Sequence, residues 1–286
     1  MYDYEILQQY LEGQRDFRNV NLVQVNLPGV NLAEIILAGA NLDQAVLPAA
    51  YLVSANLSRA NLTKINLNQA FLQRADLSFA KVSYGNLAGA DLNKSNLHGA
   101  SLIKTNLKGA KLSGANLFGV SLREANLENV NLSGADMRGI NLRLANLRGA
   151  NLSWANLSGA RLSGANLQGA ILNGVKLRGA YLNSVDLQGV DLEGVNLSEA
   201  KLNGANLTGA NLTAANLSNA SLRLAVLTLA QLQAVDLRGA DLRDVQFGEA
   251  NFARSLYTDA TQFPRGFDPR YHRAHYDAEQ LMAVPA

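Results

Sequence analysis

A five-residue period runs through almost the whole chain and constrains its fold more than any other feature. Every fifth position from Phe17 to Tyr257 is apolar, and 43 of these 49 centres are Leu. A small or β-branched residue, most often Ala, stands two positions before each centre, and Asn or Asp usually stands directly before it. A period of five fits neither the 3.6 residues of a helical turn nor the two-residue alternation of a long strand. Each unit is therefore predicted to be a short extended piece followed by a turn, with its Ala and Leu side chains pointing inward together.

Glycine marks the turn of the unit. Of the 24 glycines, 20 lie two residues after a centre, as Gly109 and Gly114 do. Glycine at a fixed turn position indicates a backbone with positive φ. Asn before the centre suits a site where a short polar side chain bonds the backbone of a neighbouring corner. The unit therefore reads Ala-(Asn/Asp)-Leu-X-X, with its turn after the centre.

The runs ANLSRANL, NLKGAKLSGANL and ANLSGARLSGANLQGA resemble the pentapeptide-repeat family, in particular its cyanobacterial members. The resemblance extends from Asp16 to Asp259. It implies an all-β fold, a right-handed quadrilateral β-helix with four units per coil. The Leu and Ala positions would lie inside, and the units would make about twelve coils between short terminal caps.

The two ends depart from the repeat and are predicted to cap the rod, because its outermost coils would otherwise expose unpaired backbone. Residues 1–14 are expected to form a helical cap that ends near Gly13, and residues 15–260 the β-helix. The helix would cover the first coil with one apolar face, made of Ile6, Leu7, Tyr10 and Leu11.

The predicted C-terminal cap and tail comprise residues 261–286. The segment TQFPRGFDPR leaves the register through Pro264 and Pro269, and it is similar to closing motifs of cyanobacterial members of the family. For the following segment, YHRAHYDAEQLMAVPA, helix and disorder both stay open.

Composition excludes several kinds of function. The net charge of +2, from 25 basic and 23 acidic residues, is too balanced to indicate nucleic-acid or membrane binding by the whole molecule. The absence of Cys excludes disulfides, thiolate metal sites and thiol nucleophiles. Asp3 and Glu5 stand where a secretory signal has basic residues, and no apolar run approaches the roughly 20 residues of a membrane span. A cytoplasmic protein is therefore expected.

No residue is predicted to be catalytic, because a regular convex rod offers no cleft in which titratable groups converge. His98 is expected to stand alone on the surface. His272, His275 and Asp277 could hold a metal only if the tail were helical, and a fourth ligand is missing from the sequence nearby. We therefore expect a protein that is not an enzyme, with no cofactor and no metal.

Sorting the outward residues by the 20-residue coil shows one basic wall, whose centres are Leu22, Leu42, Leu62 and so on to Leu242. Its bases are Lys64, Lys81, Lys104, Arg123, Arg143, Arg161, Lys201, Arg223 and Arg243, and its acids are Asp43, Glu124, Asp241 and Asp244. The first eight bases form a candidate polyanion-binding wall. The alternative is that these charges only keep rods from associating.

A candidate protein-binding patch near the N-terminal end contains outward positions that break the polar rule of the repeat: Ile36, Val46, Tyr51, Val53 and Phe71. Tyr51 and Phe71 are 20 residues apart, so their rings are expected to stack on successive coils. Exposed rings beside aliphatic residues are typical of an interface centre. The alternative is that the N-terminal helix covers this wall, or that the rings only line it.

These features leave three functions. The first is a non-enzymatic scaffold or regulatory rod that binds another protein, and the second is binding of nucleic acid or another polyanion by the basic wall. The third, imitation of DNA as implied for the quinolone-resistance members of the family, is disfavoured because a basic wall would repel a DNA-binding surface. The oligomeric state stays open.

Overall fold

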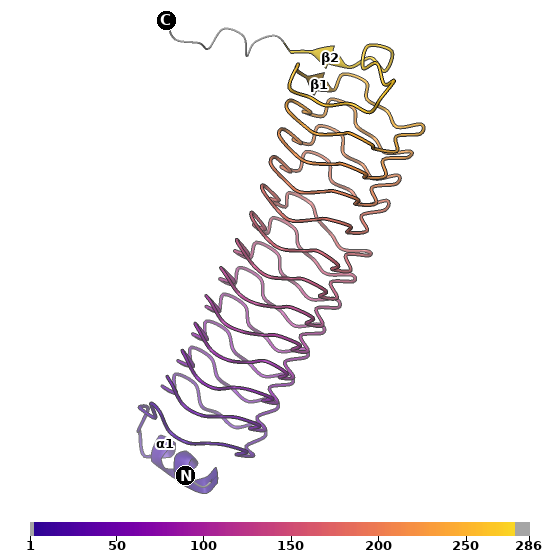
Figure 1. Ribbon diagram of the computed structural model, residues 1–286. Helices are drawn as coiled ribbons and strands as arrows, with labels where there is room; N and C mark the ends of the chain where they lie inside the picture. The colour runs from indigo at the N-terminus through magenta and orange to yellow at the C-terminus, as the bar shows by residue number, and fades with distance from the viewer. Residues whose placement is uncertain (1–2, 278–286) are drawn as a thin grey trace, which may run out of the picture.

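The computed structural model describes residues 3–277, most of which form a long rod of stacked coils (Figure 1). Parallel bridges join residues 20 positions apart in successive coils, for example Asn106 with Asn126. Each coil therefore takes up four five-residue units, and the chain is a β-helical solenoid with the predicted period. The right-handed sense and the quadrilateral cross-section of the coil stay predictions.

The four units of a coil define four walls of the rod, which we name after their first centres. Successive residues of one wall lie 20 positions apart, so the Phe17, Leu22, Leu27 and Leu32 walls each contain one unit of every coil. The basic residues described above lie on the Leu22 wall.

The interior is aliphatic, as predicted. Leu147 is 0% exposed and Ala145 is 1% exposed, and the same two positions of the unit are buried along nearly the whole rod. Leu and Ala alternate with outward residues within each short extended piece, so both side chains reach the core. The interior register inferred from the repeat is confirmed.

The turns also follow the prediction. The second residue after each centre from Phe17 to Phe252 has positive φ, whether it is Gly109 at 66° or Trp154 at 61°. Asn56 Oδ1 accepts a hydrogen bond from Ser58 N at 3.0 Å, which closes the turn locally. Between coils, Asn61 Nδ2 donates to Asn41 Oδ1 at 2.9 Å, so the Asn positions also form ladders along the rod.

The N-terminal end is covered by helix α1, Asp3–Leu11. Ile6 is fully buried, and Tyr10 OH donates to Ala33 O at 2.9 Å. Gly13 N donates to Tyr10 O at 3.1 Å, and its φ of 101° turns the chain out of the helix. The prediction was wrong for Leu11, which is 82% exposed, because Ile6, Leu7 and Tyr10 already cover the coil and the helix ends there.

At the other end, strand β1, Leu256–Tyr257, pairs in parallel with strand β2, His275–Tyr276 (Figure 1). The tail as far as Asp277 is therefore neither helical nor disordered, since it contributes the paired strand β2. Arg238 Nη1 also donates to Asp277 Oδ2 at 3.0 Å, which holds β2 in place. Residues 278–286 of the expected tail lie outside the described residues.

Backbone hydrogen bonds join each coil to the next and form a ladder along the rod. Several of these bonds are missing at residues 164–174, and we call this the opening of the ladder. One coil earlier, Gly149 N donates to Gln168 O at 2.9 Å and Leu152 N to Ile171 O at 2.8 Å. No described residue accepts a hydrogen bond from the amides of Gly164, Gly169, Leu172 and Gly174, whereas Asn166 still forms a parallel bridge with Asp186. This stretch and the coil above it are therefore less tightly joined than their neighbours.

The interior differs between the two sides of the opening. The inward position that usually holds Ala holds Val175, Val185, Val190 and Val195 here, whereas it holds Ala throughout residues 145–170 of the preceding coils.

Candidate interaction surfaces

The predicted stack of Tyr51 and Phe71 is present on the Leu32 wall. Their ring centroids are 4.6 Å apart, and the ring planes are inclined by 13°. Tyr51 is 47% exposed, so helix α1 does not bury this ring. The pair offers a flat aromatic surface that spans two coils.

The other residues of the predicted patch are divided among the walls. Val53 shares the Leu32 wall with the ring pair, whereas Ile36 bridges to Asn56 on the Phe17 wall and Val46 bridges to Asn66 on the Leu27 wall. Positions five residues apart occupy successive walls, so Ile36 and Val46 cannot join the row of Tyr51 and Phe71. The part of the patch on one wall therefore comprises Tyr51, Val53 and Phe71.

A larger aromatic column lies along the turns of the Phe17 wall, and we call it the aromatic edge: Arg59, Phe79, His98, Phe118 and Arg138. The ring of His98 lies between its two aromatic neighbours, with centroid distances of 5.0 Å to Phe79 and 5.4 Å to Phe118. The guanidinium of Arg59 lies 5.7 Å from the Phe79 centroid, and that of Arg138 lies 5.3 Å from the Phe118 centroid. The column thus crosses several coils and ends in a cation at each side.

The expectation that His98 stands alone was wrong. His98 and Phe118 occupy the same turn position one coil apart, so the 20-residue spacing could have revealed their contact. Phe79 occupies the following turn position and reaches over Gly99, where an added Cβ would lie 2.7 Å from the Phe79 ring. The absence of a side chain at Gly99 therefore leaves space for the Phe79 ring, and the repeat pattern did not indicate this.

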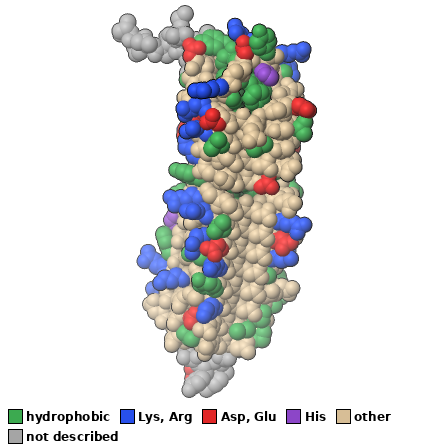
Figure 2. All heavy atoms as spheres, turned by 45° about the vertical axis from the view of Figure 1, so that its right-hand side comes forward, with side chains coloured by type: hydrophobic (Ala, Val, Ile, Leu, Met, Phe, Trp, Pro, Cys, Tyr) green, Lys and Arg blue, Asp and Glu red, His purple; other side chains and the backbone are tan. Residues whose placement is uncertain are grey.

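The bases of the Leu22 wall are exposed, but acids neutralise several of them. Glu124 lies 3.2 Å from Lys104 and 3.4 Å from Arg123, and Asp244 lies 3.5 Å from Arg223. In the view of Figure 2, Lys and Arg side chains lie along both edges of the rod, more of them along the left, with acidic side chains between them. The wall is therefore interrupted rather than uniformly basic.

The basic wall contains a hollow of about 270 Å³ lined by Arg143, Arg161, Ser163 and Tyr181. No described carboxylate forms an ion pair with Arg143 or Arg161. Lys64, Lys81 and Lys201 also lack such a partner among the described residues. Two guanidinium groups and two hydroxyl-bearing side chains at one hollow are donors suited to a phosphate or sulfate group.

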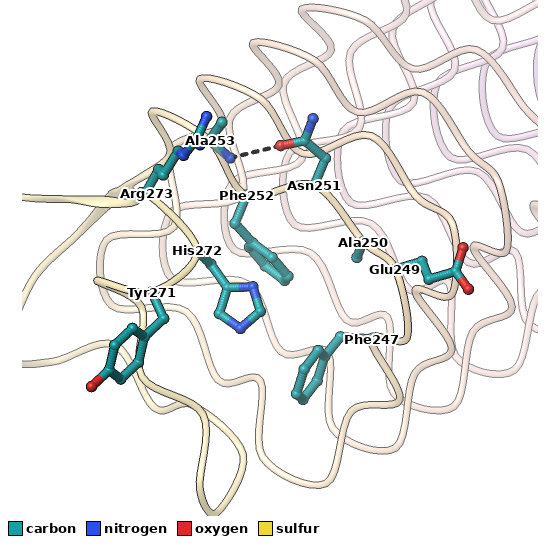
Figure 3. A pocket seen from close by; sticks show the side chains of 9 residues that line it. All are labelled: Phe247, Glu249, Ala250, Asn251, Phe252, Ala253, Tyr271, His272 and Arg273. Carbon is teal, nitrogen blue, oxygen red and sulfur yellow. Dashed lines mark hydrogen bonds between the residues drawn. The ribbon is translucent and has the colours of Figure 1, made fainter.

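A pocket of about 430 Å³ lies at the C-terminal end of the rod (Figure 3). Its apolar side includes Phe247, Phe252 and His272, and the His272 ring stacks on Phe267 at a centroid distance of 4.4 Å. Tyr271 points away from the other rings, and the Glu249 carboxylate points away from His272 (Figure 3). The sequence indicated a cap here. It did not indicate the pocket, because the pocket forms where the segment after Pro264 folds back and places Phe267 and His272 against Phe247 and Phe252.

The profile of pentapeptide repeats matches residues 16–52, 55–93, 86–119, 125–164, 160–198, 191–228 and 229–255. The chain belongs to the pentapeptide repeat family. Comparison with curated protein sequences found no match.

Several solved pentapeptide repeat structures are similar to the chain. HetL from the cyanobacterium Nostoc sp. strain PCC 7120, described as involved in heterocyst differentiation regulation, is 36% identical over 82% of this chain and 96% of its own, with a TM-score of 0.33. QnrB1, a plasmid-mediated fluoroquinolone resistance protein, is 17% identical over 82% of this chain and 92% of its own, with a TM-score of 0.29. A thylakoid-lumen protein of Arabidopsis thaliana is 27% identical over 47% of this chain and 74% of its own, with a TM-score of 0.20.

Pentapeptide repeat proteins are generally structural or binding proteins, and the geometry of this one offers surfaces more than reaction centres. Within residues 3–277, no three His, Asp or Glu side chains gather as a metal site requires. His272 stacks among rings while Asp277 binds Arg238, so the structure separates the trio considered for the tail. None of the described helical structure has the length and apolarity of a membrane-spanning helix.

Proposed function

We propose that this pentapeptide repeat protein is a non-enzymatic, right-handed and four-sided rod that binds another protein in a regulatory role. The aromatic edge carries the proposal. Phe79 is 50% exposed and Phe118 is 42% exposed, and both lie beside arginines. Exposed aromatic rings with neighbouring Arg residues are the composition of binding hot spots. HetL, 36% identical, is described as involved in regulation, which supports a role of the same kind.

The chemistry of the aromatic edge suggests what its partner presents. The rings offer apolar area, and Arg59 places a positive charge at one end of the column, whereas Arg138 at the other end is paired with Asp136 at 2.6 Å. A partner with an apolar side chain beside one carboxylate would be complementary to this surface. The stacked pair of exposed Tyr51 and half-buried Phe71 is the second proposed contact on the same rod.

The test compares cross-linked partners captured in a native cell extract by the parent protein and by variants. Phe79→Ser with Phe118→Ser removes the aromatic edge, Tyr51→Ser with Phe71→Ser removes the stacked pair, and Trp154→Ser is the control for an exposed ring elsewhere. We expect the first variant to lose a specific partner that the control retains, with circular dichroism and melting unchanged. Equal capture of every partner by all variants would refute the proposed surface.

Fractionation of the native cell tests the proposed cytoplasmic location.

Polyanion binding is the second candidate function, and the hollow between Arg143 and Arg161 favours it. Reversal of both residues to Glu should leave folding intact, because surface charges contribute little to stability. Retention on heparin should fall, and the parent protein should lose binding steeply as salt rises. Lys104→Glu with Arg223→Glu is a matched control, because those bases already have acidic neighbours. Absence of heparin retention in the parent protein would exclude this function.

A further inference from the structure

The chain contains two Asn-Gly pairs, Asn173-Gly174 and Asn203-Gly204, at equivalent turn positions of the repeat. Such pairs are chemically reactive, because the backbone nitrogen of an unhindered glycine can attack the side-chain amide carbon of the preceding Asn. The two pairs therefore carry the same reactive groups in one molecule. Only their surroundings differ.

The closed ladder protects Asn203-Gly204. Gly204 N donates to Arg223 O at 2.8 Å, which ties up the nitrogen that would have to attack. Asn203 is partly buried, and its Oδ1 accepts hydrogen bonds from Ser221 Oγ at 2.7 Å and Arg223 N at 3.0 Å. Reaction at this pair would require several hydrogen bonds to break first.

The open ladder leaves Asn173-Gly174 without this protection. Asn173 is exposed, and no described residue forms a hydrogen bond with its side-chain amide or accepts one from Gly174 N. The pair lies in the stretch where several hydrogen bonds between successive coils are missing. The attacking nitrogen and its target are thus freer to move here than at Asn203-Gly204.

We propose that Asn173 is a site of spontaneous deamidation by water, selected over Asn203 by the opening of the ladder. Gly174 N forms a bond to Asn173 Cγ while the bond from Cγ to the side-chain nitrogen breaks, and ammonia leaves with the proton from Gly174 N. Water then opens the resulting succinimide at either carbonyl. The products are aspartate and isoaspartate at position 173.

Both products change the Leu32 wall. Each adds a negative charge, and isoaspartate also lengthens the backbone of a turn whose coils depend on a 20-residue register. Trp154 lies against Gly174 and is the only Trp in the chain, so its fluorescence reports on this turn.

The experiment incubates the full chain at mildly alkaline pH, both in native buffer and in urea, and follows both Asn residues by peptide mass spectrometry. In the native protein we expect Asn173 to react at least about tenfold faster than Asn203. This is the ratio expected if one additional hydrogen bond must break before Asn203 can react. In urea the two rates should converge, because unfolding removes the protection of Asn203. An Asn173→Gln variant should lose the native reaction and the accompanying change in Trp154 fluorescence.

Equal native rates, faster reaction at Asn203, or an inert Asn173 in the native protein would each overturn the proposal. Closing the ladder gives a second measurement. Val185→Ala with Val190→Ala restores the usual Ala at two inward positions, and it should slow the reaction at Asn173 while leaving the rate at Asn203 unchanged. Hydrogen exchange shows whether this variant has closed the ladder. If it has and the rate at Asn173 is unaltered, the opening does not control deamidation.

Discussion

The indole of Trp154 lies against Gly174 in the next coil and fills the space that a Cβ at position 174 would occupy. Both residues have positive φ, 61° at Trp154 and 64° at Gly174. The missing side chain at position 174 therefore leaves the room that the indole occupies. The same relation joins Phe79 with Gly99 and Leu144 with Gly164.

This relation predicts different outcomes for two glycine substitutions. Gly174→Ala and Gly179→Ala should each destabilise the rod by about 1 kcal/mol, because alanine is strained at positive φ. An alanine at 179 meets nothing within 4 Å, whereas one at 174 must displace the indole. Only Gly174→Ala should therefore shift the emission of Trp154. Identical emission in the two variants would show that the ring does not lie on Gly174.

The buried Leu ladder should supply most of the stability, so a carboxylate placed in it should be severe. Leu147 is 0% exposed, and Leu147→Asp should cost about 4 kcal/mol because it buries a charge without a partner. Asn146→Ser is the outward control beside it. Asn146 Nδ2 donates to Asn126 Oδ1 at 3.3 Å, and loss of this bond should cost about 1 kcal/mol. Equal urea midpoints for the two variants would contradict the inward register.

The sequence predicted the features that depend on one unit alone. Inward Leu and Ala, the positive-φ turn and the bond between an Asn side chain and nearby backbone recur with the five-residue unit, so each unit repeats the same local physics. The stack of Tyr51 on Phe71 was also predictable, because it needs only the 20-residue coil in addition.

Features that depend on several coils together were missed. The aromatic edge was overlooked because Phe79 and Phe118 occupy turn positions that vary freely in the repeat, and Gly99 makes room for only one of them. The opening of the ladder was missed because the repeat pattern continues through it, and the valines at positions 175, 185, 190 and 195 are each acceptable at an inward position. The tail as far as Asp277 depends on Arg238, which lies 39 residues earlier in the chain.

The opening of the ladder predicts a local difference in hydrogen exchange. The amides of Gly169 and Leu172 should exchange at least about tenfold faster than those of Gly149 and Leu152, which donate to the next coil. Mass spectrometry of short peptides from the two coils would measure the ratio. Uniform protection across residues 147–172 would mean that the ladder is closed in solution.

The clasp at the C-terminal end predicts how docking of β2 depends on pH. Burial alone would raise the pKa of Asp236, but hydrogen bonds from Arg238 outweigh it and hold the pKa below its usual 3.8. Arg238 also binds Asp277, so one guanidinium joins the last coils to the tail. A depressed carboxyl pKa contributes stability that is present above the unfolded value and is lost as the pH falls through the folded value.

The tail should therefore stay docked from neutral pH down to about 4 and loosen only in stronger acid. Backbone amide signals of His275 and Asp277, which donate to Ser255 O at 2.7 Å and Tyr257 O at 2.8 Å, would follow the transition by NMR. Arg238→Gln should loosen the tail already at pH 7. Arg243→Gln is the matched control, because Arg243 forms the same type of pair with Asp241 at 2.8 Å but does not contact the tail. Release of β2 near pH 6 in the parent protein, or equal release in the two variants, would show that the clasp is not what holds β2.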